Sequence, residues 1–325
     1  MDHEMKFTEV TATYEPRGGV LGGPKDLMLG SVIRTAPDSD MPGAAIETGC
    51  RISVAQGPRR TICVTASEPM YWSRLLGPLY RLERLLMIFD GSFVPLKDLR
   101  FAGGSDEPPS ESDAAAVREQ SLLQRLSYFN SADYLQGMRL KLVDFKDVLT
   151  DELFGRWQML LDELDIVNQL YLYAVSDNGM PVDVSLAFLV ELAEPMVEIL
   201  KERKDLFPEL HPGGGTTLRC CLKALIGKYG GVIFGEEIDT AYDSLLDKLK
   251  DGRVRVMHIK RNQGDYFDGG CCILYLRKLS LLYRCVILDL LGVPSGAYDA
   301  RLKEISSHLD TWAEQLPVNR LGPVQ

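Results

Sequence analysis

Apolar and polar residues alternate along several segments of the first 150 positions, and this period of two predicts β-strands. The segment "CRISV" (50–54) places its apolar residues on one face, and the apolar run "TICVTA" (61–66) follows after the turn-forming "AQGPRR". These two segments predict a β-hairpin. The same alternation in "MRLKLVDF" (138–145) predicts a further strand.

From about residue 150 the apolar residues recur every three or four positions, which is the period of an amphipathic helix. The pattern predicts one helix through 151–173 and a second through 183–206, with Asp183 as its N-cap and a kink at Pro195. An earlier stripe of leucines predicts a helix at 75–86. Further helices are expected near 216–228, 236–250, 252–262, 271–291 and 298–316.

The change of period near residue 150 sets the expected architecture. A chain of 325 residues exceeds the usual size of a single hydrophobic core, so its length favours two domains. We predict an α+β fold, in which a β-containing N-terminal domain precedes an α-helical bundle. The expected parts are a mixed-β domain at 1–148, a helical domain at 149–295, and a C-terminal amphipathic helix with a tail at 296–325.

The composition indicates a globular protein without a membrane span. Charged residues make up 25% of the chain, which is ordinary for a globular domain. The start "MDHEMKFTEV" lacks the basic and apolar regions of a secretory signal, so a cytoplasmic location is expected. A charge inside a membrane costs about 2.5–3.5 kcal/mol, and the apolar helix at 271–291 contains four, which predicts burial in a bundle instead: Arg277, Lys278, Arg284 and Asp289.

Two segments resemble a nucleotide site and a metal site, but the spacing of their residues does not match either kind of site. The glycine-rich "RGGVLGGPKD" (17–26) lacks the Lys-Ser/Thr pair of a phosphate-binding loop, and a flexible turn is the better interpretation. His211 with the adjacent Cys220 and Cys221 has no spacing typical of a zinc site, so Thr216 or Thr217 is expected to cap the helix there. We expect neither a metal ion nor a cofactor, and the seven cysteines are predicted to be reduced and mostly buried.

Positive charge gathers in one stretch of an otherwise acidic chain. The formal net charge is −10, yet the segment from Lys248 to Arg261 contains six Lys/Arg and one acid, a local charge of +5. Such a run is usually a solvated helix face. It is also what a phosphate-binding surface requires, because phosphate contacts depend on local positive potential.

Within this stretch, Arg253 and His258 form an R-x4-H pattern directly after a Gly252 break between two predicted helices. Cleavage of RNA by its own 2′-hydroxyl needs a group that takes a proton near neutral pH, and imidazole suits that role. It also needs a fixed cation beside the phosphate, which a guanidinium supplies. The structural alternative is an amphipathic helix whose histidine and arginine face water.

The order of these elements resembles a known family. A long helix, the segment "LLDKLKDGRVRVMH", a polar stretch and a long apolar helix ending in "LLGVP" resemble the HEPN superfamily of ribonucleases, specifically its ApeA-like anti-phage branch. The resemblance covers about residues 150–295, and the mixed-β region before it is similar to the N-terminal domain of this branch. The family's motif arginine and histidine map onto Arg253 and His258.

The resemblance implies a function and its partners. It implies a metal-independent endoribonuclease in anti-phage defence, acting as a homodimer whose two motifs form one cleft and halting growth during infection. His258 is then the general base or acid, Arg253 stabilises the transition state, and Arg255, Lys260 and Arg261 position the RNA. The N-terminal domain is expected to sense a phage-derived trigger or to restrain the nuclease.

Two alternatives stay open. The family commonly has a polar residue after the motif arginine, whereas this chain has Val254, which together with the acidic total favours a catalytically inactive HEPN module that binds RNA or a protein partner. Arg253 lies about 140° from His258 around an ideal helix, whereas Arg255, three residues before His258, shares its face and is a candidate to substitute for Arg253 or assist it. The other alternative is a structural oligomer whose main feature is the apolar helix at 271–291.

Overall fold

The computed structural model describes residues 6–14, 27–34, 47–55, 60–91, 96–104, 140–175, 180–201, 217–259, 265–267 and 269–315. The chain divides into two compact units, Met1–Phe129 with Asp144–Met159 and Asn130–Val143 with Leu160–Gln325. All described strands lie in the first unit and most described helices lie in the second, which confirms the predicted α+β class. The expected boundaries after residues 148 and 295 stay predictions.

The first unit contains an antiparallel sheet. Its strands lie in the order β2 (Leu27–Arg34), β3 (Glu47–Ala55), β4 (Arg60–Tyr71), β1 (Lys6–Tyr14) and β5 (Lys97–Ala102). The predicted hairpin is confirmed, since β3 and β4 pair with Cys50 opposite Ala66. Cys50 and Ile52 are buried while Arg51 between them is exposed, as the alternation requires.

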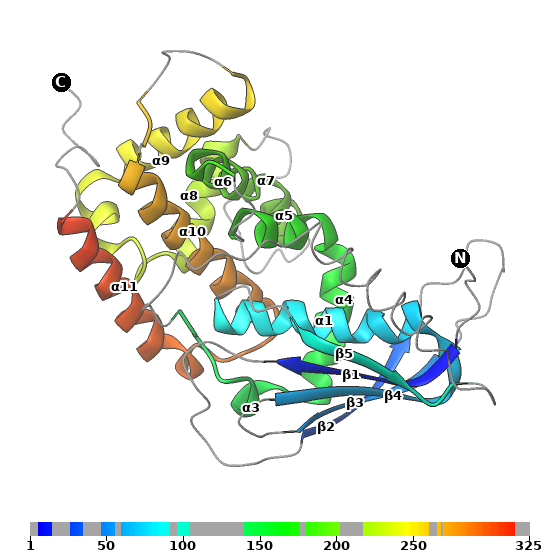
Figure 1. Cartoon of the computed structure of the whole chain (residues 1–325). Helices are drawn as coiled ribbons and strands as arrows, with labels where there is room; N and C mark the ends of the chain where they lie inside the picture. The colour runs from blue at the N-terminus through cyan, green and yellow to red at the C-terminus, as the bar shows by residue number, and fades with distance from the viewer. Residues whose placement is uncertain are drawn as a thin grey trace. The chain divides into compact units, whose positions relative to one another are not determined.

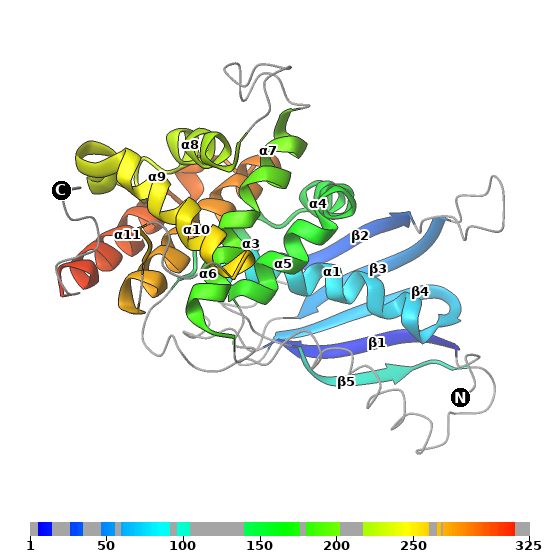
Figure 2. The ribbon, with the colours of Figure 1, turned by 90° about the horizontal axis from the view of Figure 1, so that it is seen from above.

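One helix covers the buried face of this sheet. Helix α1 (Trp72–Asp90) follows β4 directly and packs on β1, β3 and β4 (Figure 2). Its predicted leucine stripe, from Leu75 to Leu86, is buried against the apolar residues of the strands. The helix ends at Gly91, whose φ of 65° is the left-handed conformation that glycine adopts without strain.

The strand predicted at 138–145 does not form in the described part of that segment. Leu140–Val143 run without secondary structure, and α3 (Phe145–Val148) follows. The alternation correctly predicts which side chains are buried, because Leu140 and Leu142 are both buried. Their backbone, however, meets arginines instead of a neighbouring strand: Arg284 donates to the Leu140 carbonyl at 2.8 Å, and Arg301 donates to the Lys141 carbonyl at 3.1 Å.

The two long helices predicted from 151 and 183 are each divided. The first consists of α4 (Asp151–Glu163) and α5 (Asp165–Val175). The amides of Leu164 and Asn168 keep their helical bonds across the bend, so the apolar stripe continues and the sequence shows no break. The second consists of α6 (Val182–Glu191) and α7 (Ala193–Lys201), and the division falls beside Pro195 as predicted.

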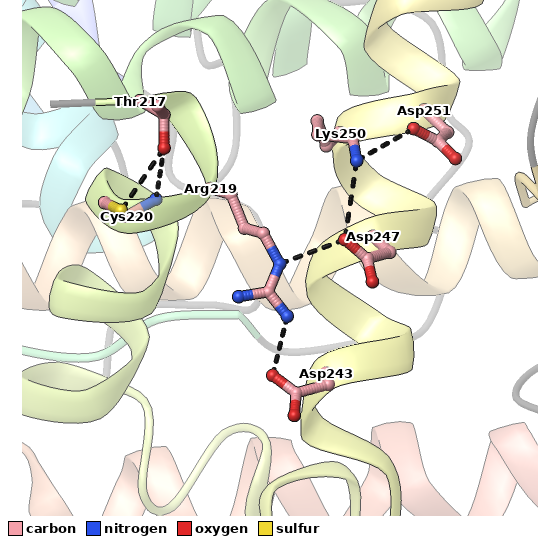
Figure 3. Close-up of polar contacts among 7 residues, drawn as sticks. All are labelled: Thr217, Arg219, Cys220, Asp243, Asp247, Lys250 and Asp251. Atoms are coloured by element: carbon pink, nitrogen blue, oxygen red, sulfur yellow. Dashed lines mark hydrogen bonds and ion pairs between the residues drawn. The ribbon is translucent and has the colours of Figure 1, made fainter. Parts of the chain in front are cut away.

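The cap predicted for α6 is wrong, whereas the cap of α8 (Leu218–Tyr229) is confirmed. Pro181 occupies the N-cap position of α6, and Asp183 lies in the first turn, where its carboxylate accepts from the Val184 amide at 3.0 Å. At α8 the N-cap is Thr217, whose hydroxyl accepts from the Cys220 amide at 3.4 Å (Figure 3). A proline cap without a side-chain bond leaves no sequence signal of the expected kind.

Helix α9 (Gly235–Met257) contradicts the predicted break at Gly252. The helix runs through Gly252 without interruption, and its non-helical backbone lies instead at Ala241, with φ −153° and ψ 34°. A glycine inside a helix costs only about 1 kcal/mol, which the packing of α9 on α6 and α8 offsets here. The candidate motif therefore lies at the end of a long helix and not at the start of a new one.

Helix α10 (Gly269–Leu290) forms the centre of the second unit, as Figure 1 shows. It packs against α5, α6, α8 and α11 (Asp299–Glu314), and burial extends around most of its circumference. The predicted stop is confirmed, because Gly292 has a φ of 74° and the Val293 amide donates back to the Leu288 carbonyl at 2.9 Å. Among the described residues, no helix has the length and apolar character needed to cross a membrane.

The thiols agree with the prediction for the cysteines. All seven are free, and five of them are buried. Cys63 in β4 is half-buried, and burial with the nearby Glu9 carboxylate raises its pKa to about 11. His308 on α11 is exposed, as expected for a surface residue.

Candidate functional site

The candidate motif occupies the last turn and the C-terminal cap of α9. Arg253 lies in the final helical turns, and His258 caps the helix with φ −105° and ψ 6°. The His258 amide still donates to the Val254 carbonyl at 3.1 Å. Ile259 then adopts a φ of 50°, which is outside the helical range, and His258 is exposed.

This ending of the helix brings the two predicted catalytic side chains together. Nη1 of Arg253 lies 3.5 Å from Nε2 of His258, which is the outer limit of a hydrogen bond. On an ideal helix the two positions differ by about 140° around the axis. The pair nevertheless meets at the end of α9, where His258 no longer has helical φ and ψ.

The carboxylate of Glu191, which no sequence pattern indicates, forms an ion pair with Arg253. Glu191, the last residue of α6, accepts from Nη2 of Arg253 at 2.8 Å and pairs through its other oxygen with Nε. These bonds raise the pKa of Arg253 above its ordinary value. Because Glu191 occupies the Nε and Nη2 edge of the guanidinium, Nη1 is the nitrogen that faces His258. Glu191 lies 62 residues from Arg253, and no local pattern marks it.

The remaining predicted RNA-binding residues fall in two groups. The Arg255 guanidinium stacks on the ring of Tyr266, with 4.0 Å between its central carbon and the ring centroid. Lys260 and Arg261 lie outside the described residues. The structure therefore places Arg253, His258 and Arg255 at the same end of α9 and leaves the positions of the other two as predictions.

The positive run is accompanied by more carboxylates than the sequence suggests. Lys248 is nearly buried and forms an ion pair with Asp265 at 3.2 Å. Lys250 pairs with Asp247 at 3.4 Å and with Asp251 at 3.2 Å. With Glu191 on Arg253, these acids lower the positive potential that was predicted for the run as a whole.

A charged network fixes the middle of α9 against α8. Figure 3 shows Arg219 of α8 between Asp243 and Asp247, with bonds of 2.6 and 2.9 Å, and Lys250 between Asp247 and Asp251. Burial acts to raise the pKa of Asp247, but its bonds with Arg219 give a net lowering. The network lies one turn before the motif and so restrains the helix that carries Arg253 and His258.

A small hollow adjoins the motif. It lies between the first turns of α6, the last turns of α9 and residues 266–267, and Arg253 and Arg255 both line it. Among the residues that the structure describes, no three His, Cys, Asp or Glu side chains are grouped as a metal site. His211, the candidate metal ligand near Cys220 and Cys221, lies outside the described part of the chain.

Comparisons with models of known protein families, with curated proteins and with solved structures give no match for this chain.

Proposed function

We propose that the protein is a metal-independent endoribonuclease in which His258 and Arg253 act on one phosphodiester bond. The observation that carries the proposal is the 3.5 Å separation between Nη1 of Arg253 and Nε2 of His258. It combines a proton-exchanging imidazole, exposed to solvent, with a permanently charged donor. Cleavage of RNA through its 2′-hydroxyl needs these two groups beside each other.

In the proposed reaction, each group has one role. His258 removes the proton from the 2′-hydroxyl, and the 2′-oxygen attacks the adjacent phosphorus. The bond to the 5′-oxygen breaks, and that oxygen takes a proton from a second acid. The products are a 2′,3′-cyclic phosphate and a 5′-hydroxyl. Arg253 binds the non-bridging phosphate oxygens as negative charge gathers on them.

The second acid is the reason for proposing a homodimer. A single exposed His258 serves one proton transfer, whereas the reaction has two. Two helical domains that associate with their motifs facing each other supply a second imidazole to the same cleft. The family resemblance implies this arrangement, and the position of His258 at an exposed helix end is compatible with it.

Glu191 fits the proposal as a positioning residue. A bidentate carboxylate fixes the plane of a guanidinium. Because Glu191 takes the Nε and Nη2 edge, Arg253 presents Nη1 beside the imidazole without needing the substrate to order it. Such preorganisation reduces the entropy that binding must otherwise supply.

The biological setting of the proposal comes from the resemblance alone. In this setting the enzyme acts in the cytoplasm and cleaves cellular RNA during phage infection. Arg255, Lys260 and Arg261 position the RNA. The N-terminal domain senses a phage-derived trigger or restrains the nuclease. These parts of the proposal rest on analogy of fold and motif.

One observation favours a second candidate function. The charge of Arg253 is offset by Glu191, and Val254 supplies no polar group to orient His258. A catalytically inactive HEPN module that binds RNA or a protein partner would tolerate both features. An assay of chemistry, and not of binding alone, separates the two candidates.

Incubation of the purified full-length chain with a defined RNA in EDTA is expected to give fragments that end in a 2′,3′-cyclic phosphate and begin with a 5′-hydroxyl. The chelator is without effect because no step uses a metal. End groups are identified by mass spectrometry and by their need for phosphatase or kinase treatment before ligation. Fragments with 3′-hydroxyl ends, or cleavage abolished by EDTA, contradict the mechanism, and retention of the RNA without cleavage favours the inactive module.

A further inference from the structure

The hollow beside Arg253 is lined by both charged and aromatic side chains. We propose that it binds the guanine base of the nucleotide whose 2′-hydroxyl attacks, so that RNA is cut on the 3′ side of guanosine. The inference rests on the proposed function and names its substrate preference. The side chains that carry it are Asp183, Lys248, Arg253, Arg255, Tyr266 and Phe267.

The position of the hollow brings a base close to the reacting phosphate. Arg253 lines the hollow and also faces His258 through Nη1. In the proposed site, the hollow takes the base of the nucleotide on the 5′ side of the phosphate that this nitrogen holds. This is the nucleotide that carries the attacking 2′-hydroxyl.

Tyr266 supplies a surface on which a base can stack. Its ring is half-buried and carries the Arg255 guanidinium at 4.0 Å, which is a stacking distance. Phe267, the next residue, is buried and stacks on Tyr275 with 4.0 Å between the ring centroids. The cavity volume is about 10 Å³. A base therefore enters by taking the place of Arg255 on the ring, and Arg255 then covers its other face or pairs with phosphate.

The polar groups of the hollow favour guanine over the other bases. Three charged residues line the hollow. The Asp183 carboxylate only accepts hydrogen bonds and already accepts one from the Val184 amide, while Lys248 and Arg255 only donate them. Guanine has two adjacent donors, N1–H and N2–H, that match the two oxygens of a carboxylate, and acceptors at O6 and N7 for the cations. Adenine, cytosine and uracil each place a ring or carbonyl acceptor where the carboxylate would meet it, and like partners repel.

Binding of the four nucleoside 3′-monophosphates, measured by isothermal titration calorimetry, tests the site without requiring cleavage. The full-length chain is expected to bind 3′-GMP about 10–100-fold more tightly than the other three, which is the discrimination that one bidentate pair provides. Asp183→Asn is expected to remove this preference. Tyr266→Ala is expected to lower the affinity for all four nucleotides, whereas Tyr266→Phe keeps the wild-type affinity because the ring remains. Asp239→Asn, an exposed aspartate on α9, is the matched control and changes nothing.

Equal affinity for all four nucleotides, or a preference that survives in Asp183→Asn, overturns the guanine site. Sequencing of the fragment ends separates this failure from failure of the proposed function. Cleavage without enrichment of guanosine at the cyclic phosphate overturns the site and leaves the nuclease standing. Guanine-selective binding by a chain that cuts no RNA upholds the site and overturns the nuclease. Thermal unfolding of each variant identifies any that fails to fold, and the preference of the wild-type chain for 3′-GMP over the other three nucleotides then decides the test by itself.

Discussion

Replacement of His258 by alanine is expected to lower the rate of RNA cleavage by about 10²–10⁴-fold, the range over which a positioned acid or base contributes. The imidazole lies 3.5 Å from Nη1 of Arg253 and is exposed at the end of α9. Its removal takes away the group that accepts the 2′-hydroxyl proton, but it disturbs no buried contact. The initial rate on a fixed RNA substrate is the measurement, with the melting temperature unchanged.

His308→Ala is the matched control for this prediction. His308 is an exposed histidine on α11, so its loss removes an imidazole of the same kind from a different part of the second unit. The control is expected to cleave at the wild-type rate. Equal activity of wild type, His258→Ala and His308→Ala would show that another group performs the chemistry or that a contaminant does.

Replacement of Lys278 by methionine is expected to lower the free energy of unfolding by about 3–5 kcal/mol, the cost of breaking a buried ion pair by removing one partner. Nζ of Lys278 donates to both oxygens of Glu237, at 2.7 and 2.9 Å, and to Asp310 at 2.8 Å. Lys278 is 0% exposed and Glu237 1%. The variant leaves the Glu237 carboxylate buried without its cation, so the loss is large.

Urea denaturation followed by circular dichroism measures this loss. Lys303→Met, an exposed lysine on α11, is the control and is expected to change stability by less than about 0.5 kcal/mol. The double variant Lys278→Met with Glu237→Leu is expected to recover part of the loss, because it removes the unpaired charge as well. A loss below 1 kcal/mol in Lys278→Met would mean that solvent reaches Glu237 and replaces the lysine.

The periodicity of apolar residues predicted most of the elements because it reports burial directly. The leucines of α1, the alternation of Cys50 and Ile52 in β3 and the stop of α10 at Gly292 all appear in the structure as predicted. In each of these places the local pattern and the packing agree. The α+β class follows from them, since one region has the period of strands and the next has the period of helices.

The same periodicity fails where backbone partners come from distant residues. The alternation at Leu140 and Leu142 is correct for side-chain burial, but Arg284 and Arg301 satisfy the backbone in place of a strand. At Gly252 the sequence predicted a break in the helix, but the helix continues. The packing of α9 on its neighbours offsets the destabilising effect of this glycine. Neither outcome is visible in a local window of sequence.

The candidate site was predictable only in part. Arg253 and His258 were identified from the needs of the chemistry, and the structure places them 3.5 Å apart. No sequence pattern indicates Glu191, because its contact with Arg253 depends on how α6 packs on α9. The acids beside Lys248 and Lys250 likewise show that a local count of charge overstates the potential of a run whose partners lie elsewhere in the fold.

A double-mutant cycle of Arg253→Ala and His258→Ala on RNA cleavage most directly tests whether the two side chains act as one unit on one bond. Groups that act together are strongly non-additive, so the double variant is expected to cleave no more than about threefold slower than the worse single variant. The contradicting result is a double variant whose loss equals the product of the two single losses, or a wild-type chain that does not cleave RNA.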